Sequence, residues 1–343
     1  MTAPTERELS IVIKAFNEES NIERTLRSIF AATEGLDFEV ILADSLSTDD
    51  TVKIARRFPV TVAQLENARD RSCGIGAQLG YQHSAGRFVL VMDGDMEIER
   101  DWLFAALNRL RADTKIGGIG GMVEDVNLES IEFRARRQRK SRELMIGEVD
   151  RLYGGGLFRR SAIEAAGYLT NRNLHACEEL ELGLRLWATG WKMERLDMVS
   201  MHHYGHTVPI WILVRKRWKS RYVNGAGELI RASIGRPWFK RALASFKLQL
   251  LVLAWWSTIA VLSVASVFNA EWLFWIVFVI LLPPTAMVLR KRSLSLGLYS
   301  IFAWTMETIG LLRGILAPQL DPTLRVASRV VHTPERRAAR AAM

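Results

Sequence analysis

Two aspartates that are separated by one residue follow a short apolar run. The tripeptide Asp93-Gly94-Asp95 comes directly after the segment RFVLVM, which has the composition of a buried strand. In an extended chain, residues two positions apart point to the same side, and the glycine between them leaves room for a ligand. Paired carboxylates of this kind suit Mg²⁺ or Mn²⁺ bridging a diphosphate. Solvated loop acids are the competing interpretation, and the position after a buried strand favours the metal site.

Further acids and histidines lie between residues 178 and 203. Glu178 and Glu179 open a segment of helical periodicity, with Glu181 close behind. All three acids could simply favour a helix N-terminus. His202 and His203 follow the strand-like run LDMVSM.

Strand-like runs alternate with helical patterns through the first 112 residues. The expected strands cover 9–16, 38–43, 60–63 and 87–92, and the expected helices begin near 20, 48, 72 and 101. Short strands joined by helices predict an α/β fold with a doubly wound, mostly parallel sheet. Ligands bind such sheets at the carboxyl ends of the strands, where Asp44 and Asp93 both fall.

From Leu9 to His206 the sequence resembles the family 2 glycosyltransferases, which have a Rossmann-like GT-A fold. The resemblance is carried by the segments IVIKAFNEESNIERTLRSI, EVILADSLSTDDT, GIGAQLGYQHSAGRFVLVMDGDM, YGGGLFRRSAIEAAGYL and CEELELGLRLWATGWK. Lys14 stands where the family usually has proline, and Ser45 stands where it usually has a second aspartate. The resemblance implies an enzyme that binds a nucleotide-activated sugar.

The resemblance also implies a donor site. The strand that ends at Asp44 is expected to contact the nucleotide base, with Asn17 and Glu18 of the opening segment in the same site. Asp93 and Asp95 are expected to bind the metal, Mg²⁺ or Mn²⁺, and through it the diphosphate. His202 or His203 is expected to ligate the same metal, and the sequence does not say which of the two faces it.

On the acceptor side, Glu178 and Glu179 match an acidic pair whose second member is the general base, although the family usually has aspartate there. Glu181 is the alternative base. Arg217 resembles the arginine of a Q-x-x-R-W motif and is a candidate donor-binding residue. Because Val214 stands where the glutamine belongs, processive polymer synthesis is not expected. The basic run at 134–142 is expected to contact acceptor phosphates or a membrane, or to form a solvated helix.

The C-terminal part of the chain has the character of a membrane protein. Residues 207–247 mix basic and aromatic side chains, which predicts interfacial amphipathic helices on anionic lipid and no nucleic-acid partner. The stretches 248–268 and 272–289 approach the length of about 20 residues that spans a bilayer. The stretch 296–316 contains charged residues and would place the basic tail 317–343 outside if it crossed, so an interfacial or re-entrant helix is favoured.

These observations predict a location at the plasma (inner) membrane. The net charge is +9, and the basic flanks of the two spans place the catalytic domain in the cytoplasm by the positive-inside rule. The two cysteines cannot build a disulfide framework, and the N-terminus lacks the apolar segment of a signal peptide. The expected regions are a GT-A domain at 1–206, an interfacial segment at 207–247, a membrane region at 248–316 and a cytoplasmic tail at 317–343.

The predicted reaction is inverting, metal-dependent transfer of a sugar from a nucleoside-diphosphate sugar to a lipid-linked acceptor such as a polyprenyl-linked glycan. A hydroxyl acceptor needs a base, whereas a lipid phosphate is already anionic, so the acidic pair favours a sugar acceptor. Two alternatives remain at this stage. The chain could be a polyprenyl-phosphate glycosyltransferase, or a catalytically silent scaffold that binds nucleotide sugars in a membrane complex.

Overall fold

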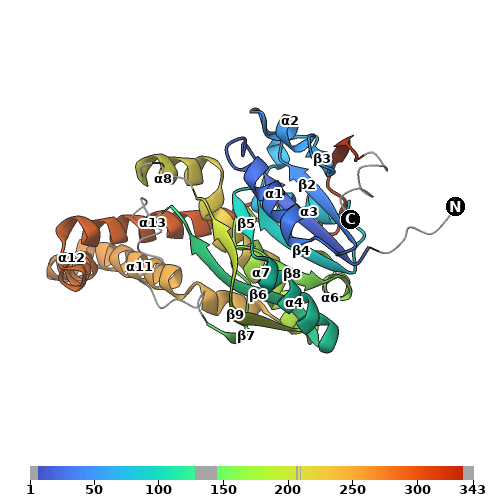
Figure 1. Ribbon diagram of the computed structural model, residues 1–343. Helices are drawn as coiled ribbons and strands as arrows, with labels where there is room; N and C mark the ends of the chain where they lie inside the picture. Colours follow the sequence, from blue (N-terminus) through green and yellow to red (C-terminus); the bar gives the residue numbers. More distant parts are fainter. Residues whose placement is uncertain (1–6, 128–144, 206–207, 209, 335–343) are drawn as a thin grey trace. The chain divides into compact units, whose positions relative to one another are not determined.

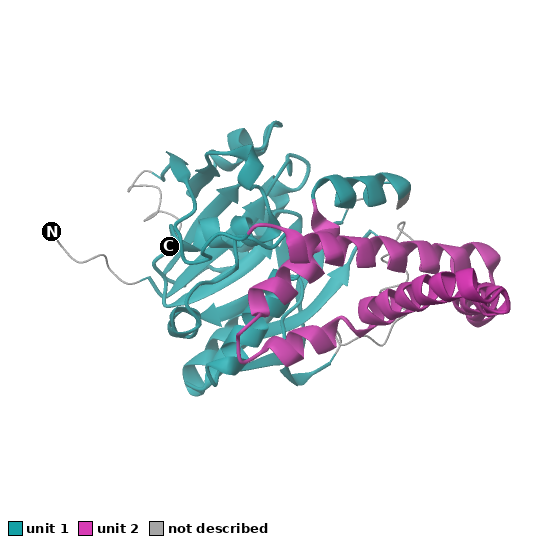
Figure 2. Cartoon of the chain, turned by 180° about the vertical axis from the view of Figure 1, so that it is seen from behind, with its two compact units in different colours: residues 1–220, 319–343 teal, residues 221–318 magenta. Residues whose placement is uncertain are grey.

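The computed structural model describes residues 7–127, 145–205, 208 and 210–334. The chain divides into two units. Unit 1 comprises Met1–Ser220 and Gln319–Met343, and unit 2 comprises Arg221–Pro318 (Figure 2). This division differs from the predicted boundaries at 206, 247 and 316.

Unit 1 is built on one ten-stranded mixed sheet. Its strands are β1 (Leu9–Ala15), β2 (Phe38–Asp44), β3 (Thr61–Leu65), β4 (Phe88–Asp93), β5 (Met96–Ile98), β6 (Ile116–Asp125), β7 (Gly147–Val149), β8 (Gly156–Arg159), β9 (Lys192–His203) and β10 (Ser328–His332). The order is β10-β3-β2-β1-β4-β8-β6-β9-β5, with β7 paired to β9. Strands β1 to β4 are mutually parallel, as the sequence predicts, and β8 and β10 run antiparallel to this group.

Helices cover both faces of this sheet (Figure 1). They are α1 (Ile22–Ala32), α2 (Thr51–Ala55), α3 (Cys73–Tyr81), α4 (Arg100–Ala112), α6 (Arg160–Ala165) and α7 (Glu178–Ala188). Helix α8 (Ile210–Lys219) also belongs to unit 1. Side chains alternate between the faces of a strand, so Ile11 and Ile13 of β1 pack in the core that includes α1 and α4, while Val12 packs in the core that includes α7. Burial on both faces explains the continuous apolar runs in the sequence.

The segment after residue 318 adds a strand to the sheet of unit 1. Strand β10 pairs antiparallel with β3. Val326 is buried, and the side chain of Gln82 donates to its carbonyl oxygen at 2.8 Å and accepts from its N–H at 3.0 Å. A five-residue strand with arginine on an edge carries too weak a periodic signal to be recognised without its partner.

Unit 2 contains the apolar helices. Its elements are η3 (Tyr222–Asn224), α9 (Gly225–Ser233), α10 (Phe239–Ser245), α11 (Lys247–Phe268), α12 (Trp272–Lys291) and α13 (Leu294–Leu316). Among the described residues, α11 and α12 are the helices long and apolar enough to cross a membrane by length and composition. Both cover the stretches predicted as spans. Helix α13 covers the third predicted stretch and packs closely on α9 at Gly227 and Gly314.

Candidate active site

The carboxyl ends of β1 and β4 lie side by side, in a register that pairs Lys14 with Asp93. Lys14 Nζ lies 2.9 Å from Asp93 Oδ1 and 3.7 Å from Glu178 Oε1. Burial alone would lower the pKa of Lys14, but Asp93, Glu178 and Glu179 outweigh this effect and raise it well above its ordinary value. The ammonium therefore stays charged between the two predicted acidic sites.

Asp95 lies in the short turn between β4 and β5. Its Oδ2 is 3.3 Å from His203 Nε2. Its Oδ1 is buried and has no hydrogen-bond partner among the residues that the structure describes. Burying a carboxylate oxygen without a partner costs free energy, unless a cation or a hydrogen-bond donor binds to it. Asp95 Oδ1 is therefore suited to bind a ligand.

The two adjacent histidines point to opposite sides of β9. His203 Nδ1 lies 2.7 Å from Asp125 Oδ1, and its other ring nitrogen faces Asp95. Burial would lower the pKa of His203, yet the hydrogen bonds to Asp125 and Asp95 raise it to about 10. His202 instead lies against Glu99, 2.9 Å from its Oε1. The structure thus places His203 beside the aspartates and turns His202 away, which argues against a metal role for His202.

The residues at this end of the sheet fit a divalent cation of the Mg²⁺ or Mn²⁺ type. Within the described ranges no three His, Cys, Asp or Glu side chains form a ready-made cage. Mg²⁺ is usually held by one or two carboxylates together with substrate phosphates, so a complete cage is not required. Asp95 offers the unpaired oxygen, Asp93 is 39% exposed, and the hydrogen bond to Asp125 orients His203.

Asn17 and Glu18 shape the adjoining loop. The Asn17 side chain accepts from Thr48 N at 2.8 Å. It therefore links the loop after β1 to the loop after β2. Glu18 packs against Gly94, where an added Cβ would lie 3.1 Å from Glu18 Cγ. Burial and the charges of Asp95 and Asp93 raise the pKa of Glu18 to about 7, against a hydrogen bond from Asn21 that lowers it.

Asp44 ends β2 and is fully buried. Its carboxylate accepts from Ser47 N at 3.2 Å and from Gln64 Nε2 at 2.9 Å. Beside this loop the Arg71 guanidinium stacks on the ring of Phe16, with 3.8 Å to the ring centroid, and Phe16 is 40% exposed. Phe16 was not among the residues predicted for the site. Its position as a single aromatic residue directly after an apolar strand is the sequence signal that could have indicated it.

On the acceptor side, Glu178 and Glu179 open α7 and line a pocket that also includes Lys14 and Thr170. Glu179 Oε1 accepts from Gly154 N at 2.9 Å. Burial and the neighbouring Glu178 raise the pKa of Glu179 to about 7, and Lys14 acts in the opposite direction. A carboxylate with this pKa can take a proton near neutral pH.

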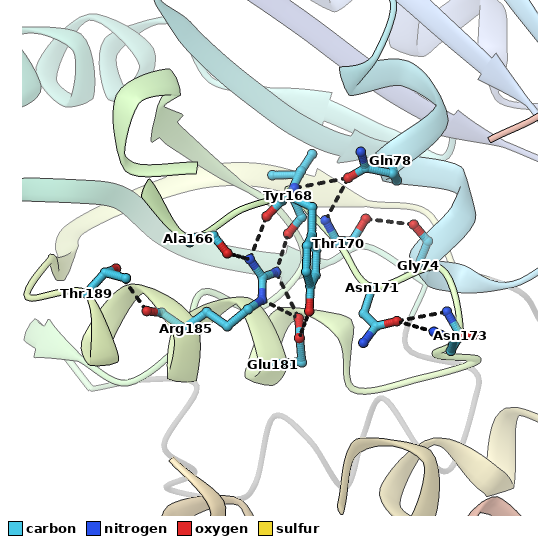
Figure 3. A network of polar contacts seen from close by, with 11 residues as sticks. Gly74, Gln78, Ala166, Tyr168, Thr170, Asn171, Asn173, Glu181, Arg185 and Thr189 are labelled. Atoms are coloured by element: carbon cyan, nitrogen blue, oxygen red, sulfur yellow. Dashed lines mark hydrogen bonds and ion pairs between the residues drawn. The ribbon is translucent and has the colours of Figure 1, made fainter. Parts of the chain in front are cut away.

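Glu181, the alternative base, is committed to a structural network (Figure 3). Its Oε1 accepts from Tyr168 OH at 2.6 Å, and its Oε2 lies 2.8 Å from Arg185 NH2, in a pair that is almost fully buried. Arg185 also donates to the carbonyl oxygens of Ala166, Tyr168 and Leu169. With both oxygens occupied, Glu181 has no free site for an acceptor proton.

The remaining predicted residues lie elsewhere. Arg217 is in α8 and does not line the pocket described above. The basic run at 134–142 lies outside the described residues.

Comparison with known proteins decides the family. The model for Glycosyl transferase family 2 matches residues 10–167, which include Asp44, Asp93 and Asp95. This part of the chain is a family 2 glycosyltransferase domain. The resemblance seen in the sequence is thereby confirmed for residues 10–167.

Individual relatives agree with this assignment. Glycosyltransferase AglE of Haloferax volcanii is 30% identical over 120 residues, which make up 34% of this chain and 39% of that protein. The poly-beta-1,6-N-acetyl-D-glucosamine synthase of Staphylococcus epidermidis is 22% identical over 325 residues, 88% of this chain and 72% of that one. The match to AglE therefore spans well under half of that relative.

A solved structure confirms the fold. Mannosyltransferase PcManGT from Pyrobaculum calidifontis, in complex with GDP-Man and Mn²⁺, superposes with a TM-score of 0.59 and 20% identity, covering 91% of this chain and 88% of that one. The GT-A fold expected from the sequence is therefore the fold of this chain.

Proposed function

We propose that the chain is an inverting, metal-dependent glycosyltransferase that moves a sugar from a nucleoside-diphosphate sugar to a lipid-linked sugar acceptor. One observation carries the proposal: Lys14 stands between Asp93 on the donor side and the Glu178–Glu179 pair on the acceptor side. A donor and an acceptor bound to these two groups would meet within one pocket.

The donor site in this proposal uses Phe16 for the nucleotide base. Asp44 holds the loop after β2 through Ser47 N, and Asn17 links that loop to the loop after β1. Asp93, Asp95 and His203 would hold Mg²⁺ or Mn²⁺. When bound there, the cation supplies charge neutralisation for the departing diphosphate. The unpaired oxygen of Asp95 and the Mn²⁺ in the PcManGT complex support this assignment.

The chemical step follows from the position of Glu179. Its carboxylate accepts the proton of an acceptor hydroxyl, and the acceptor oxygen bonds to the anomeric carbon on the side opposite the diphosphate. The bond between that carbon and the diphosphate oxygen breaks, and its electron pair leaves with the nucleoside diphosphate. The configuration at the anomeric carbon is therefore inverted.

Each unit has a surface suited to a membrane, which supports a lipid-linked acceptor. In unit 1, helix α8 exposes Trp211 and carries Arg215, Lys216 and Lys219, a mixture suited to an anionic lipid surface. In unit 2, α11 and α12 have the length and composition of membrane spans. We infer that the enzyme works at the cytoplasmic face of the plasma membrane.

The sheet also restricts the membrane topology. Strands β1 and β10 belong to one sheet, so the segments before residue 221 and after residue 318 lie on the same side of any membrane. The chain between them must then cross an even number of times. Two crossings by α11 and α12 satisfy this rule, and α13 is left as an interfacial or re-entrant helix.

Product analysis with purified protein tests the proposal. Labelled nucleotide sugars are incubated with a polyprenyl-linked sugar or with bare polyprenyl phosphate, with Mn²⁺ or with a chelator. We expect transfer to the lipid-linked sugar, loss of transfer with the chelator, and loss of Mn²⁺-enhanced nucleotide binding in Asp95→Asn. The control Glu97→Gln removes an acid of β5 that pairs with Arg24, and it should retain both properties.

Other outcomes assign the alternatives. Transfer to bare polyprenyl phosphate alone would identify a polyprenyl-phosphate glycosyltransferase. A protein that binds a nucleotide sugar, but neither transfers the sugar nor hydrolyses any donor in the presence of metal, would be a silent scaffold. Unchanged metal dependence in Asp95→Asn would remove this residue from the metal site.

A further inference from the structure

Lys14 occupies the centre of the candidate active site. It is the last residue but one of β1, and its side chain is 19% exposed. Its stem lies against α3 at Gly76, where an added Cβ would come 3.5 Å from Lys14 Cγ. Ala77 of the same helix lines the pocket together with Lys14. Two small residues of α3 therefore leave the space through which the lysine reaches the carboxylates.

The ammonium of Lys14 on β1 connects groups from two other elements. Asp93 comes from β4, and Glu178 and Glu179 come from α7. An ammonium has three N–H donors, and Asp93 takes one of them at 2.9 Å. Glu178 lies 3.7 Å away, within ion-pair range. Without this charge, three carboxylates would face one another in a partly buried pocket.

The charges that face Glu179 come from each of these elements. Glu178 on α7 and Asp93 on β4 both favour its protonated form, and Lys14 on β1 favours its ionised form. Among the described charged groups that shift the pKa of Glu179, Lys14 carries the positive charge. A general base has to be ionised before it can accept a proton.

We propose that Lys14 is a positioning residue that ties the base-bearing helix α7 to the metal-binding aspartate and supplies the positive charge against which Glu179 acts as a base. This inference rests on the proposed function, because it assumes that Glu179 serves the acceptor.

The pH profile of transfer tests this role. In the wild type, kcat should rise with pH and level off above about 7. Lys14→Met keeps an aliphatic stem without the charge, and loss of an opposite charge at this range shifts a carboxyl by roughly 1 to 3 pH units. We expect the rising limb to move upward by at least about 1 unit, with about fivefold slower transfer at pH 7 that recovers at higher pH.

Two matched variants separate charge from structure. Lys14→Arg keeps the charge and should keep the limb near its wild-type position. Lys53→Met removes an exposed lysine that pairs with Asp50 on α2, and it should not move the limb. If Lys14→Met does not fold, as judged by circular dichroism, Lys14→Gln replaces it. The proposal is overturned if Lys14→Met or Lys14→Gln folds and kcat still rises over the same pH range as in the wild type.

A substrate-free measurement keeps this inference distinct from the proposed function. Infrared difference spectra between pH values report carboxyl protonation, and the band that disappears in Glu179→Gln belongs to Glu179. If the pH at which that band changes is higher in Lys14→Met, the role of Lys14 is supported even if the wild type transfers no sugar. Absence of any shift rejects it even if transfer is active.

Discussion

Glu179 and Glu181 lie two positions apart on α7 and have different environments. Glu179 lines the pocket and accepts one backbone hydrogen bond, whereas Glu181 is buried with Tyr168 and Arg185. The sequence leaves both as candidate bases, because each is a glutamate in the first turn of a helix. The structure favours Glu179 as the base and gives Glu181 a role in folding.

Glu179→Gln should slow transfer to a hydroxyl acceptor by about 10²- to 10⁴-fold, the usual contribution of general acid–base catalysis. The amide keeps the shape of the side chain but cannot accept the proton. Nucleotide affinity, measured by calorimetry, should persist because the donor site uses other residues. If transfer to a hydroxyl acceptor proceeds at the wild-type rate, Glu179 is not the base.

Glu181→Gln should instead destabilise unit 1. Removing one partner of a buried ion pair typically costs about 3 to 5 kcal/mol, because the other charge stays buried. Denaturant unfolding of the purified protein measures this loss. Glu148→Gln, which removes an exposed partner of Lys192, serves as the control and should unfold like the wild type. A fully stable Glu181→Gln with slow transfer would reverse the roles of the two glutamates.

At the scale of elements, the loop before α7 is fixed to α3. Thr170 Oγ1 donates to the Gly74 carbonyl oxygen at 2.6 Å, and Gln78 Oε1 accepts from Leu169 N and Thr170 N (Figure 3). An added Cβ at Gly74 would lie 2.0 Å from the Asn171 carbonyl oxygen. Only glycine allows this approach, and it sets the position from which α7 begins.

Gly74→Ala is therefore expected to lower the free energy of unfolding by about 1 to 3 kcal/mol, the usual cost of overpacking. Gly76→Ala on the same helix meets only ordinary contacts and gains helix propensity, so it should be neutral or stabilising. Denaturant unfolding of both variants measures the difference. Equal stability would show that the loop is free to move away from α3.

At the scale of the whole molecule, β10 makes the C-terminal segment part of the catalytic unit. Val326 just before it is buried, whereas Val330 within it is 46% exposed. Val326→Asp places a charge in the core and should unfold unit 1 at a lower temperature, and Val330→Asp should have little effect. Thermal denaturation of the two variants checks this contrast. Similar melting curves would mean that the burial of Val326 contributes nothing to the stability of unit 1.

The topology makes a second prediction at this scale. With the catalytic domain in the cytoplasm as proposed, a C-terminal reporter tag should be protected inside intact cells, because β10 shares a sheet with β1. A tag placed at 269–271, between α11 and α12, should be accessible from outside. Impermeant labelling of intact and permeabilised cells measures both. External labelling of the C-terminal tag would require α13 to cross the membrane and β10 to leave the sheet.

Local patterns in the sequence determined much of this protein. Apolar runs followed by acids identified β1, β2 and β4 and placed Asp44, Asp93 and Asp95 at their carboxyl ends. The two span-length helices were also predictable, because length and hydropathy are local properties. These features need no knowledge of what lies across the sheet.

Only the tertiary structure separated His203 from His202 and Glu179 from Glu181. Neighbouring residues of the same type carry the same local signal, and their roles depend on which side chains other elements bring against them. The same holds for Lys14, whose partners come from β4 and α7, and for β10, whose partner β3 lies more than two hundred residues earlier. Such contacts join residues distant in sequence, and no local pattern in one segment records the position of another.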